Sequence, residues 1–320
     1  MRKAAWALIA VAALVFAWFA WGWYGGGPTD KDTAFTVPDG ATLTSVAGKL
    51  EKERLVGSKS GFLLRAKILG SGDPVQRGEF AIPAGSSAAT ILDTLQHGQV
   101  IRRFVTVPEG LPSIMVYEKL MAEPLLTGPI PVPAEGSVLP DTYDFERGES
   151  RVKVLARMQS AMTKYLAEIW SKRKSGIAVT TPQQAVTLAS IVEKETGVPS
   201  ERRMVAGLYS NRVRQGMPLQ ADPTIIYPIT KGKPLGRRIR QSEIAAVNGY
   251  NTYTMSGLPV GPITNPGRES IAAVLNPAAT DALYMVANGK GGHVFASTLA
   301  EHNANVQRWF AIRRARGELK

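Results

Sequence analysis

The chain has 320 residues, which suggests about two domains. A hydrophobic content of 44% and a charged content of 20% are ordinary for a globular protein and argue against a disordered chain. The absence of cysteine excludes disulfides, thiol nucleophiles and cysteine metal sites, and with only three histidines we expect no metal. The net charge of +12 points to an anionic partner or surface.

An uncharged apolar run at residues 4–24 follows Arg2 and Lys3. The run is long enough to cross about 30 Å of hydrocarbon as a helix, and Trp21, Trp23 and Tyr24 fall where an aromatic interface belt is expected. The basic N-terminus predicts a cytoplasmic tip and a body outside the cytoplasm. A cleaved signal peptide is the alternative, but its apolar region is shorter, about 7–15 residues. We therefore expect residues 1–30 to form a tip, an uncleaved anchor and an exit linker.

Two similar patterns follow the linker, at residues 35–56 and 78–98. Each reads as a short strand, a turn that contains proline and an amphipathic helix. The pair predicts a small α+β domain over residues 31–104. Local similarity without a true repeat is the alternative.

The rest of the chain, residues 105–320, is predicted as a second, mixed α+β domain. A strand and turn are expected at 101–110, irregular Pro- and Gly-rich structure at 124–145, and a hairpin with an Asn-Gly loop at 283–297. Helices are expected at 113–121, 151–173, 182–195, 200–214 (capped by Ser200) and 298–315. Unusual polar-aromatic loops are expected at 219–229, 249–267 and 291–303.

The helix predicted at 182–195 ends in two acids, Glu193 and Glu195. Residues two apart on a helix point about 200° from each other, so the two carboxyl groups cannot face one site as a pair. The last turn of a helix disfavours negative charge, and apolar neighbours raise the pKa of a carboxyl. A carboxyl of raised pKa is what a general acid requires. The alternative is a pair of exposed helix-end glutamates, and spacing alone does not choose between the two acids.

Several common kinds of site are missing from the sequence. It contains no G-x-S-x-G elbow, no Walker A loop and no H-E-x-x-H helix. The basic stretch 202–240, where the single acid is Asp222, lacks the interleaved aromatic residues of a base-stacking surface. We therefore expect no nucleic-acid partner. The stretch is either a solvated basic face or a contact for an anionic extracellular polymer.

Five motifs together carry a resemblance to a known family. They are "LPDTYDF", "ASIVEKET", "LQADPTIIY", "YNTYTMSGLPVGPITNPG" and "LYMVANGKGGHVFASTLAEHN". With these in order over residues 35–310, the chain resembles the endolytic murein transglycosylases, the YceG-like family. One departure is "EGSVLPDTY", where family members tend to carry a bulkier residue near Ser137.

The resemblance implies a fold and an activity. It implies an N-terminal transmembrane helix, a small LysM-like domain and a mixed α+β catalytic domain. The implied activity is membrane-anchored, endolytic lytic cleavage of nascent peptidoglycan strands between MurNAc and GlcNAc. The products would carry 1,6-anhydro-MurNAc ends, and elongation would stop. The implied location is the inner membrane, single-pass, with the body in the periplasm. The implied partners are glycan strands and peptidoglycan synthases (penicillin-binding proteins), and no cofactor is implied.

The resemblance also implies the site residues. The family's catalytic glutamate falls on the first acid of "VEKE", which is Glu193. Its loop motifs fall on residues expected to bind substrate, namely Gln220, Asp222, Thr224, Tyr250, Asn251 and Tyr253.

The implied chemistry needs one carboxyl group, because the 6-hydroxyl of the sugar replaces water as nucleophile and is already held close. An ordinary glycosidase needs two carboxylates. Three other functions remain open. They are a non-catalytic wall-binding module, a pyridoxal-phosphate lyase of the aminodeoxychorismate type, and a hydrolytic muramidase that pairs Glu193 with Asp222.

Overall fold

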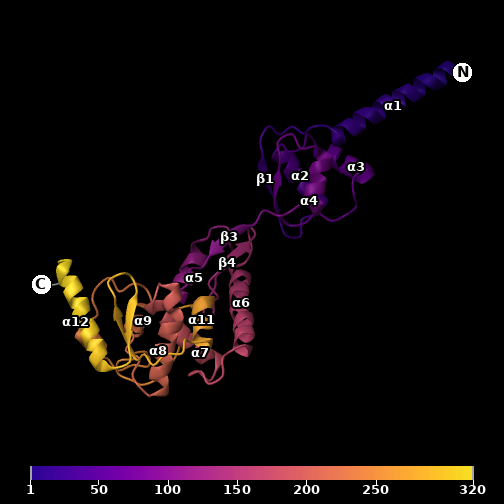
Figure 1. Cartoon of the computed structure of the whole chain (residues 1–320). Coiled ribbons are helices and arrows are strands. Elements are labelled where there is room, and N and C mark those ends of the chain that lie inside the picture. Colours follow the sequence, from indigo (N-terminus) through magenta and orange to yellow (C-terminus); the bar gives the residue numbers. More distant parts are fainter. Residues whose placement is uncertain (1, 319–320) are drawn as a thin grey trace. The chain divides into compact units, whose positions relative to one another are not determined.

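The computed structural model describes residues 2–318, without the side chain of Arg2. Met1, Leu319 and Lys320 lie outside the described residues. Met1 is the first residue of the segment expected at 1–30, and Leu319 and Lys320 are the last two residues of the domain expected at 105–320. The chain divides into two compact units. Unit 1 runs to Arg103 and adds Asp144–Gly148, and unit 2 comprises Phe104–Tyr143 and the chain from Glu149 onward. The mixed α+β class expected from the sequence is confirmed (Figure 1).

The N-terminal helix α1 (Arg2–Tyr24) is apolar, and its side chains from Lys3 to Trp18 are exposed. Its segment Lys3–Tyr24 has a mean hydropathy of 2.1 and is long enough to cross a membrane. Trp21 and Tyr24 are exposed, as an interface belt requires, but Trp23 is not. Trp23 is 2% exposed, with its ring centroid 5.8 Å from that of Phe62. The expectation that Trp23 belongs to the belt was therefore wrong, because this side chain is part of the core of unit 1.

Unit 1 has the order β1 (Thr33–Val37), α2 (Leu43–Lys52), α3 (Lys59–Leu69), β2 (Gly78–Ile82) and α4 (Ala88–His97). The strands β1 and β2 pair antiparallel, with Phe35 opposite Phe80, and both rings are buried. The two expected strand-turn-helix segments thus share one sheet. The helix α3 between them was not predicted, although Ser58 caps it by accepting a hydrogen bond from the Gly61 N–H.

The strands β3 (Arg103–Thr106) and β4 (Thr142–Phe145) form a second two-stranded sheet. The helix α5 (Ser113–Ala122) lies between them in sequence. The structure therefore places a strand at the end of the segment 124–145, which was expected to be irregular. In unit 1 the buried carboxylate of Glu79 pairs with Arg103 and, at 3.0 Å, with Arg147. This pairing ties the segment 144–148 to unit 1.

Unit 2 is built around the helix α7 (Pro182–Glu195), whose residues from Ala185 to Val192 are all buried. The helices α8 (Arg202–Arg214) and α11 (Arg268–Leu275) pack against it. Each fully buried aliphatic side chain in such a core contributes roughly 1.5–3 kcal/mol. The remaining elements are α6 (Arg151–Ser171), η1 (Pro199–Glu201), α9 (Pro223–Thr230), α10 (Gln241–Ile244), β5 (Tyr284–Ala287), β6 (His293–Ala296) and α12 (Leu299–Ala315).

The start of α7 is capped by a side chain. Thr181 Oγ1 accepts from the Gln184 N–H at 3.1 Å, and Pro182 occupies the first turn. The Gln184 side chain accepts from the Thr180 N–H at 2.8 Å rather than from the cap residue itself. The helix predicted at 182–195 is therefore observed with both of its ends.

Two other predicted boundaries need correction. The helix expected at 200–214 begins as the short 3-10 turn η1, and α8 starts at Arg202 without a side-chain cap. Ser200 is thus not its cap. The segment 219–229, expected as a loop, contains α9. Pro223 fits the first turn of α9, and Pro228 lies within it.

Candidate active site

The side chains of Glu193 and Glu195 face different parts of unit 2, as their spacing predicts. Glu193 Oε2 accepts a hydrogen bond from the Gly267 N–H at 2.9 Å. Its charge also raises the pKa of Glu109, after the larger effect of burial, while Arg202 opposes the rise. Arg202 and Glu109 form an ion pair at 3.3 Å. Glu193 is therefore held beside a second carboxyl and a backbone N–H.

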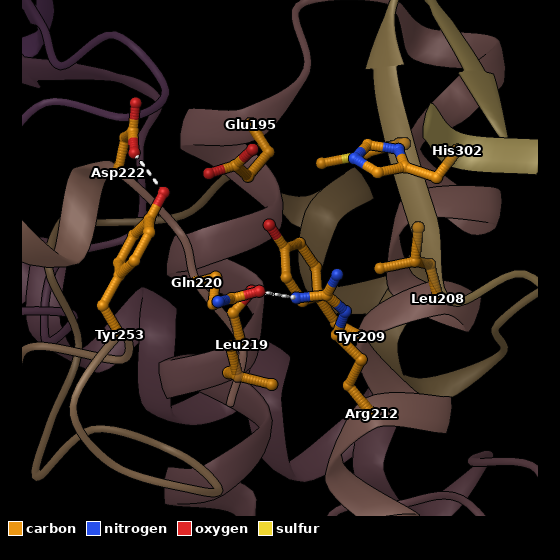
Figure 2. Close-up of a pocket in the computed structure, with 10 residues that line it drawn as sticks. Glu195, Leu208, Tyr209, Arg212, Leu219, Gln220, Asp222, Tyr253 and His302 are labelled. Carbon is orange, nitrogen blue, oxygen red and sulfur yellow. Dashed lines mark hydrogen bonds between the residues drawn. The ribbon is translucent and has the colours of Figure 1, made fainter. Parts of the chain in front are cut away.

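Glu195, the last residue of α7, opens into a pocket of about 340 Å³. Figure 2 shows the lining side chains around this space, with Asp222 and Tyr253 on one side and His302 on the other. The lining is mostly polar and comes from α7, α8, the loop before α9, the 249–267 loop, β5 and α12. Its residues are Glu195, Leu208, Tyr209, Arg212, Leu219, Gln220, Asp222, Tyr253, Met285 and His302.

Burial, and after it the nearby charge of Asp222, raise the pKa of Glu195, which reaches about 7. A hydrogen bond from the Tyr209 hydroxyl and the positive charge of Arg212 act against this rise. A carboxyl group with a pKa near neutrality is protonated in a large fraction of molecules and can both donate and accept a proton. The pocket therefore contains one group suited to general acid-base chemistry.

Arg212 is a buried cation that organises the floor of the pocket. Its guanidinium donates to the carbonyl oxygens of Leu219 at 2.9 Å and Leu283 at 2.6 Å, and to Gln220 Oε1 at 3.3 Å. The guanidinium also lies 5.3 Å from the ring centre of Tyr284. These contacts fix α8 against the loop that precedes α9, so the cation shapes the pocket as well as balancing its acids.

The expected substrate-binding residues separate into two groups. Gln220, Asp222 and Tyr253 line the pocket with Glu195. The Tyr253 hydroxyl donates to Asp222 Oδ1 at 2.6 Å. Gln220 has φ of 53°, a left-handed conformation that few non-glycine residues adopt, and its N–H donates to the Thr252 carbonyl at 3.0 Å. This strained backbone turns the loop at the pocket edge.

Thr224 and Asn251 are fully buried and hold loops together. The Thr224 and Thr252 hydroxyl groups are hydrogen bonded at 2.8 Å. The Asn251 side-chain amide donates to the carbonyl oxygens of Ile244 and Ala246 at 2.9 and 2.7 Å. These contacts position the 249–267 loop, which carries Tyr253.

Tyr250, like Thr224 and Asn251, was expected to bind substrate but does not line the pocket. Its ring centroid lies 4.8 Å from that of Tyr227. Burial raises the pKa of Tyr227, and the nearby carboxyl of Glu135 adds to the rise. Glu135 in turn accepts from the Ser113 N–H at 2.8 Å, and burial raises its pKa as well. Tyr250 thus belongs to a separate polar cluster.

Glu193, expected as the catalytic residue from the resemblance, does not line the pocket that contains Gln220, Asp222 and Tyr253. Its catalytic role stays a prediction, and the geometry favours Glu195. The sequence reasoning missed Tyr209, Arg212 and His302 as pocket residues. Arg212 belongs to the basic stretch 202–240 noted in the sequence, but the charge pattern of that stretch does not show which arginine is buried. Among residues 2–318, no group of three or more potential ligands could hold a metal ion.

The helical core with two-stranded sheets, and the polar pocket around one carboxyl of raised pKa, define a mixed α+β protein with a candidate acid-base site. A sequence profile of the YceG-like family matches residues 35–308, and the chain belongs to this family.

Similar curated proteins include two that are named endolytic murein transglycosylase. The one from Bacillus subtilis (strain 168) is 27% identical, over 89% of this chain and 88% of the relative. The one from Streptococcus pneumoniae serotype 2 (strain D39) is 28% identical, over 84% of this chain and 57% of the relative. A solved structure of a YceG-like protein from Listeria monocytogenes aligns over 86% of this chain and 98% of its own, with a TM-score of 0.54 and 24% identity. The likeness to the solved structure concerns the fold alone.

Proposed function

We propose that the protein is a membrane-anchored endolytic lytic transglycosylase of peptidoglycan, with Glu195 as its acid-base residue. It cleaves nascent glycan strands between MurNAc and GlcNAc, leaves 1,6-anhydro-MurNAc ends and so terminates elongation. The observation that carries the proposal is the carboxyl of Glu195, with a pKa raised to about 7, in a polar pocket. The names of the B. subtilis and S. pneumoniae relatives support the substrate.

In the first step the protonated Glu195 carboxyl donates its proton to the glycosidic oxygen, and the bond from that oxygen to C1 of MurNAc breaks. The departing GlcNAc gains a 4-hydroxyl group. In the second step the 6-hydroxyl of the same MurNAc attacks C1, and its proton returns to Glu195. No water is consumed, and one carboxyl acts in both directions.

Neighbouring side chains suit Glu195 to this cycle. The negative charge of Asp222 favours the protonated form, which is needed first. The Tyr209 hydroxyl and Arg212 favour the ionised form, which is needed once the proton has left. The opposing influences keep the pKa near neutrality, where a group can work as acid and then as base. Gln220 and Tyr253 offer amide and hydroxyl partners for sugar hydroxyl groups.

Glu193 is the alternative acid, on the strength of the family resemblance. Its contact with the Gly267 N–H and its closeness to Glu109 give it a defined environment of its own. Glu193 does not line the pocket that holds Gln220, Asp222 and Tyr253. This difference leads us to prefer Glu195.

The remaining parts of the proposal concern place and partners. We propose that α1 crosses the inner membrane once, with the body in the periplasm, and that unit 1 is the LysM-like domain. The apolar helix supports the first point, and a compact βααβ arrangement with its own core supports the second. Glycan strands are the substrate, and peptidoglycan synthases are proposed as partner proteins.

The deciding experiment compares Glu195→Gln with Glu193→Gln. The amide keeps the size of the side chain but cannot exchange the proton, and general acid-base catalysis contributes typically 10²–10⁴-fold. We expect Glu195→Gln to lose at least this factor in turnover and Glu193→Gln to keep most of its activity. Anhydro-ended products from purified glycan strands are counted by mass spectrometry, after matching melting curves confirm that both variants fold.

The same products test the competing functions. A hydrolytic muramidase that uses Asp222 as second carboxylate adds water, so its products are heavier by one water molecule than anhydro products. A dead Glu193→Gln beside an active Glu195→Gln would reverse our assignment. Full activity in both variants would exclude both glutamates as the catalytic acid, and the absence of any cleavage by the unaltered protein would favour a wall-binding module.

A further inference from the structure

The helix α3 carries two exposed apolar side chains beside the anchor helix α1. Leu64 is 54% exposed and Ile68 is 59% exposed. They lie four residues apart and therefore on one face of the helix. The opposite face, with Phe62 and Ala66, is buried in the core of unit 1. Leu64 and Ile68 thus form an apolar surface that the core of unit 1 does not explain.

The contact between α3 and α1 is specific. Arg65 Nε donates to the Phe19 carbonyl at 3.0 Å, and its guanidinium lies 5.1 Å from the ring centre of Phe19. At Gly22 an added Cβ would come within 2.5 Å of the Arg65 guanidinium, so this glycine permits the close approach. In Figure 1, α3 lies beside the end of α1 at which the chain enters unit 1. The two helices are therefore fixed relative to each other.

The height of this contact along α1 indicates where α3 lies relative to a bilayer. From Lys3 to Phe19 the helix rises about 24 Å, at 1.5 Å per residue. The hydrocarbon layer is about 30 Å thick. A guanidinium held at Phe19 is thus close to the level at which the helix leaves the hydrocarbon. The exposed rings of Trp18 and Trp21 occupy the same level, as interfacial aromatic residues do.

The charge of α3 fits an anionic surface. The helix contains Lys59, Arg65 and Lys67 and no acidic residue. Lys67 is exposed next to Ile68. Apolar side chains with flanking basic groups are the pattern of a helix that lies in the headgroup region, about 5–10 Å into the boundary with the acyl chains.

We propose that α3 is a second membrane contact. In this arrangement Leu64 and Ile68 enter the outer leaflet beside α1, and Lys67 meets anionic lipid headgroups. The inference rests on the anchor of the proposed function and goes beyond it, because it fixes the orientation of unit 1 on the membrane. A lone transmembrane helix with a free linker would leave unit 1 able to rotate.

The test uses the full chain in lipid nanodiscs. Because the sequence has no cysteine, Ile68→Cys gives a single labelling site for an environment-sensitive fluorophore. The lipids include an anionic phospholipid and carry a spin-label quencher near the headgroup. Trp21→Cys reports on the anchor itself. Gln99→Cys, exposed in the segment between α4 and β3, is the control in the same unit.

We expect the fluorescence at position 68 to be lost to the same extent as at position 21, with little loss at position 99. Lys67→Glu, added to Ile68→Cys, should reduce that loss. Quenching at position 21 with none at position 68 overturns the α3 contact and leaves the anchor standing. If neither position 68 nor position 21 is quenched, both the α3 contact and the membrane anchor are overturned. Unchanged quenching with Lys67→Glu overturns the role of the headgroups.

Discussion

At the scale of single residues, the environment of Glu195 makes the activity depend on pH. Its pKa is raised to about 7, so the protonated form required for the first step is lost as pH rises through that value. We expect kcat/KM for glycan cleavage to fall above pH 7. Asp222→Asn removes a negative charge that raises this pKa, and the falling limb should move to lower pH. The measurement is a pH profile of anhydro-product formation.

The control for this shift is Asp281→Asn, an exposed acid elsewhere in unit 2. Its profile should match that of the unaltered protein. If the falling limb of the Asp222→Asn profile stays at the same pH, the ionisation of Glu195 does not control the cleavage rate.

Protein stability gives a second readout of the same pKa. A group whose pKa is raised in the folded state stabilises the fold fully below its unfolded pKa of 4.5, and this contribution is lost as pH rises through about 7. Glu195→Gln should therefore gain unfolding free energy relative to the unaltered protein between these pH values. At about 1.4 kcal/mol per pKa unit, the gain above pH 7 is on the order of 3 kcal/mol.

Residue spacing predicted that Glu193 and Glu195 face different surroundings, and this is confirmed. Spacing could not tell which one faces a pocket, because that depends on Tyr209 and Asp222, which arrive from other elements. The resemblance brought Gln220, Asp222 and Tyr253 forward as site residues, and all three lie in one pocket. No local pattern separated them from Thr224 and Asn251, whose burial follows from tertiary packing.

At the scale of elements, Arg212 joins α8 to the loop before α9. Arg212→Lys keeps the charge but loses the planar fork that reaches several carbonyl oxygens at once. Hydrogen bonds to charged groups are each worth about 1.5–3 kcal/mol, so we expect a loss of roughly 2–3 kcal/mol in unfolding free energy. Cleavage should also slow, because Gln220 loses its anchor. Chemical unfolding and product counting measure the two effects.

Arg214→Lys on the same helix is the matched control. Arg214 lies at the surface, bonded to the Gly176 carbonyl at 2.8 Å. Surface substitutions of this kind usually change stability by less than about 0.5 kcal/mol. Equal losses in the two variants would contradict a special role for the buried arginine.

Helices that begin with a capping side chain could be predicted from the sequence, as α7 with Thr181 and α12 with Thr298 demonstrate. The helix α3 was missed because Leu64 and Ile68 lie on its exposed face and blur the periodicity that marks a buried side. The helix α9 was missed because Pro223 and Pro228 indicate a loop when considered singly. The antiparallel pairing of β1 with β2 depends on contacts far apart in sequence, which local patterns do not contain.

At the scale of the whole molecule, we predict that residues 4–24 stay on the mature protein as a transmembrane helix. Intact mass of the membrane-extracted protein should include this segment, and a reporter fused to the C-terminus should be active only outside the cytoplasm. A variant without residues 4–20, directed outside by a cleavable leader and still carrying the buried Trp23, should be released in soluble form. Recovery of soluble natural protein starting near Gly25 would show instead that the segment is a signal peptide.

The pocket is assembled from segments that lie far apart in the chain. Its lining runs from Glu195 in α7 to His302 in α12, more than a hundred residues later. During synthesis, therefore, Glu195 is made well before His302, the last residue that lines its pocket. Until the later segments that line the pocket have emerged and packed, Glu195 faces more water and lacks the nearby charge of Asp222, so its carboxyl should ionise as an ordinary exposed glutamate does. A partly synthesised chain therefore contains Glu195 but not yet the raised pKa that the proposed reaction requires.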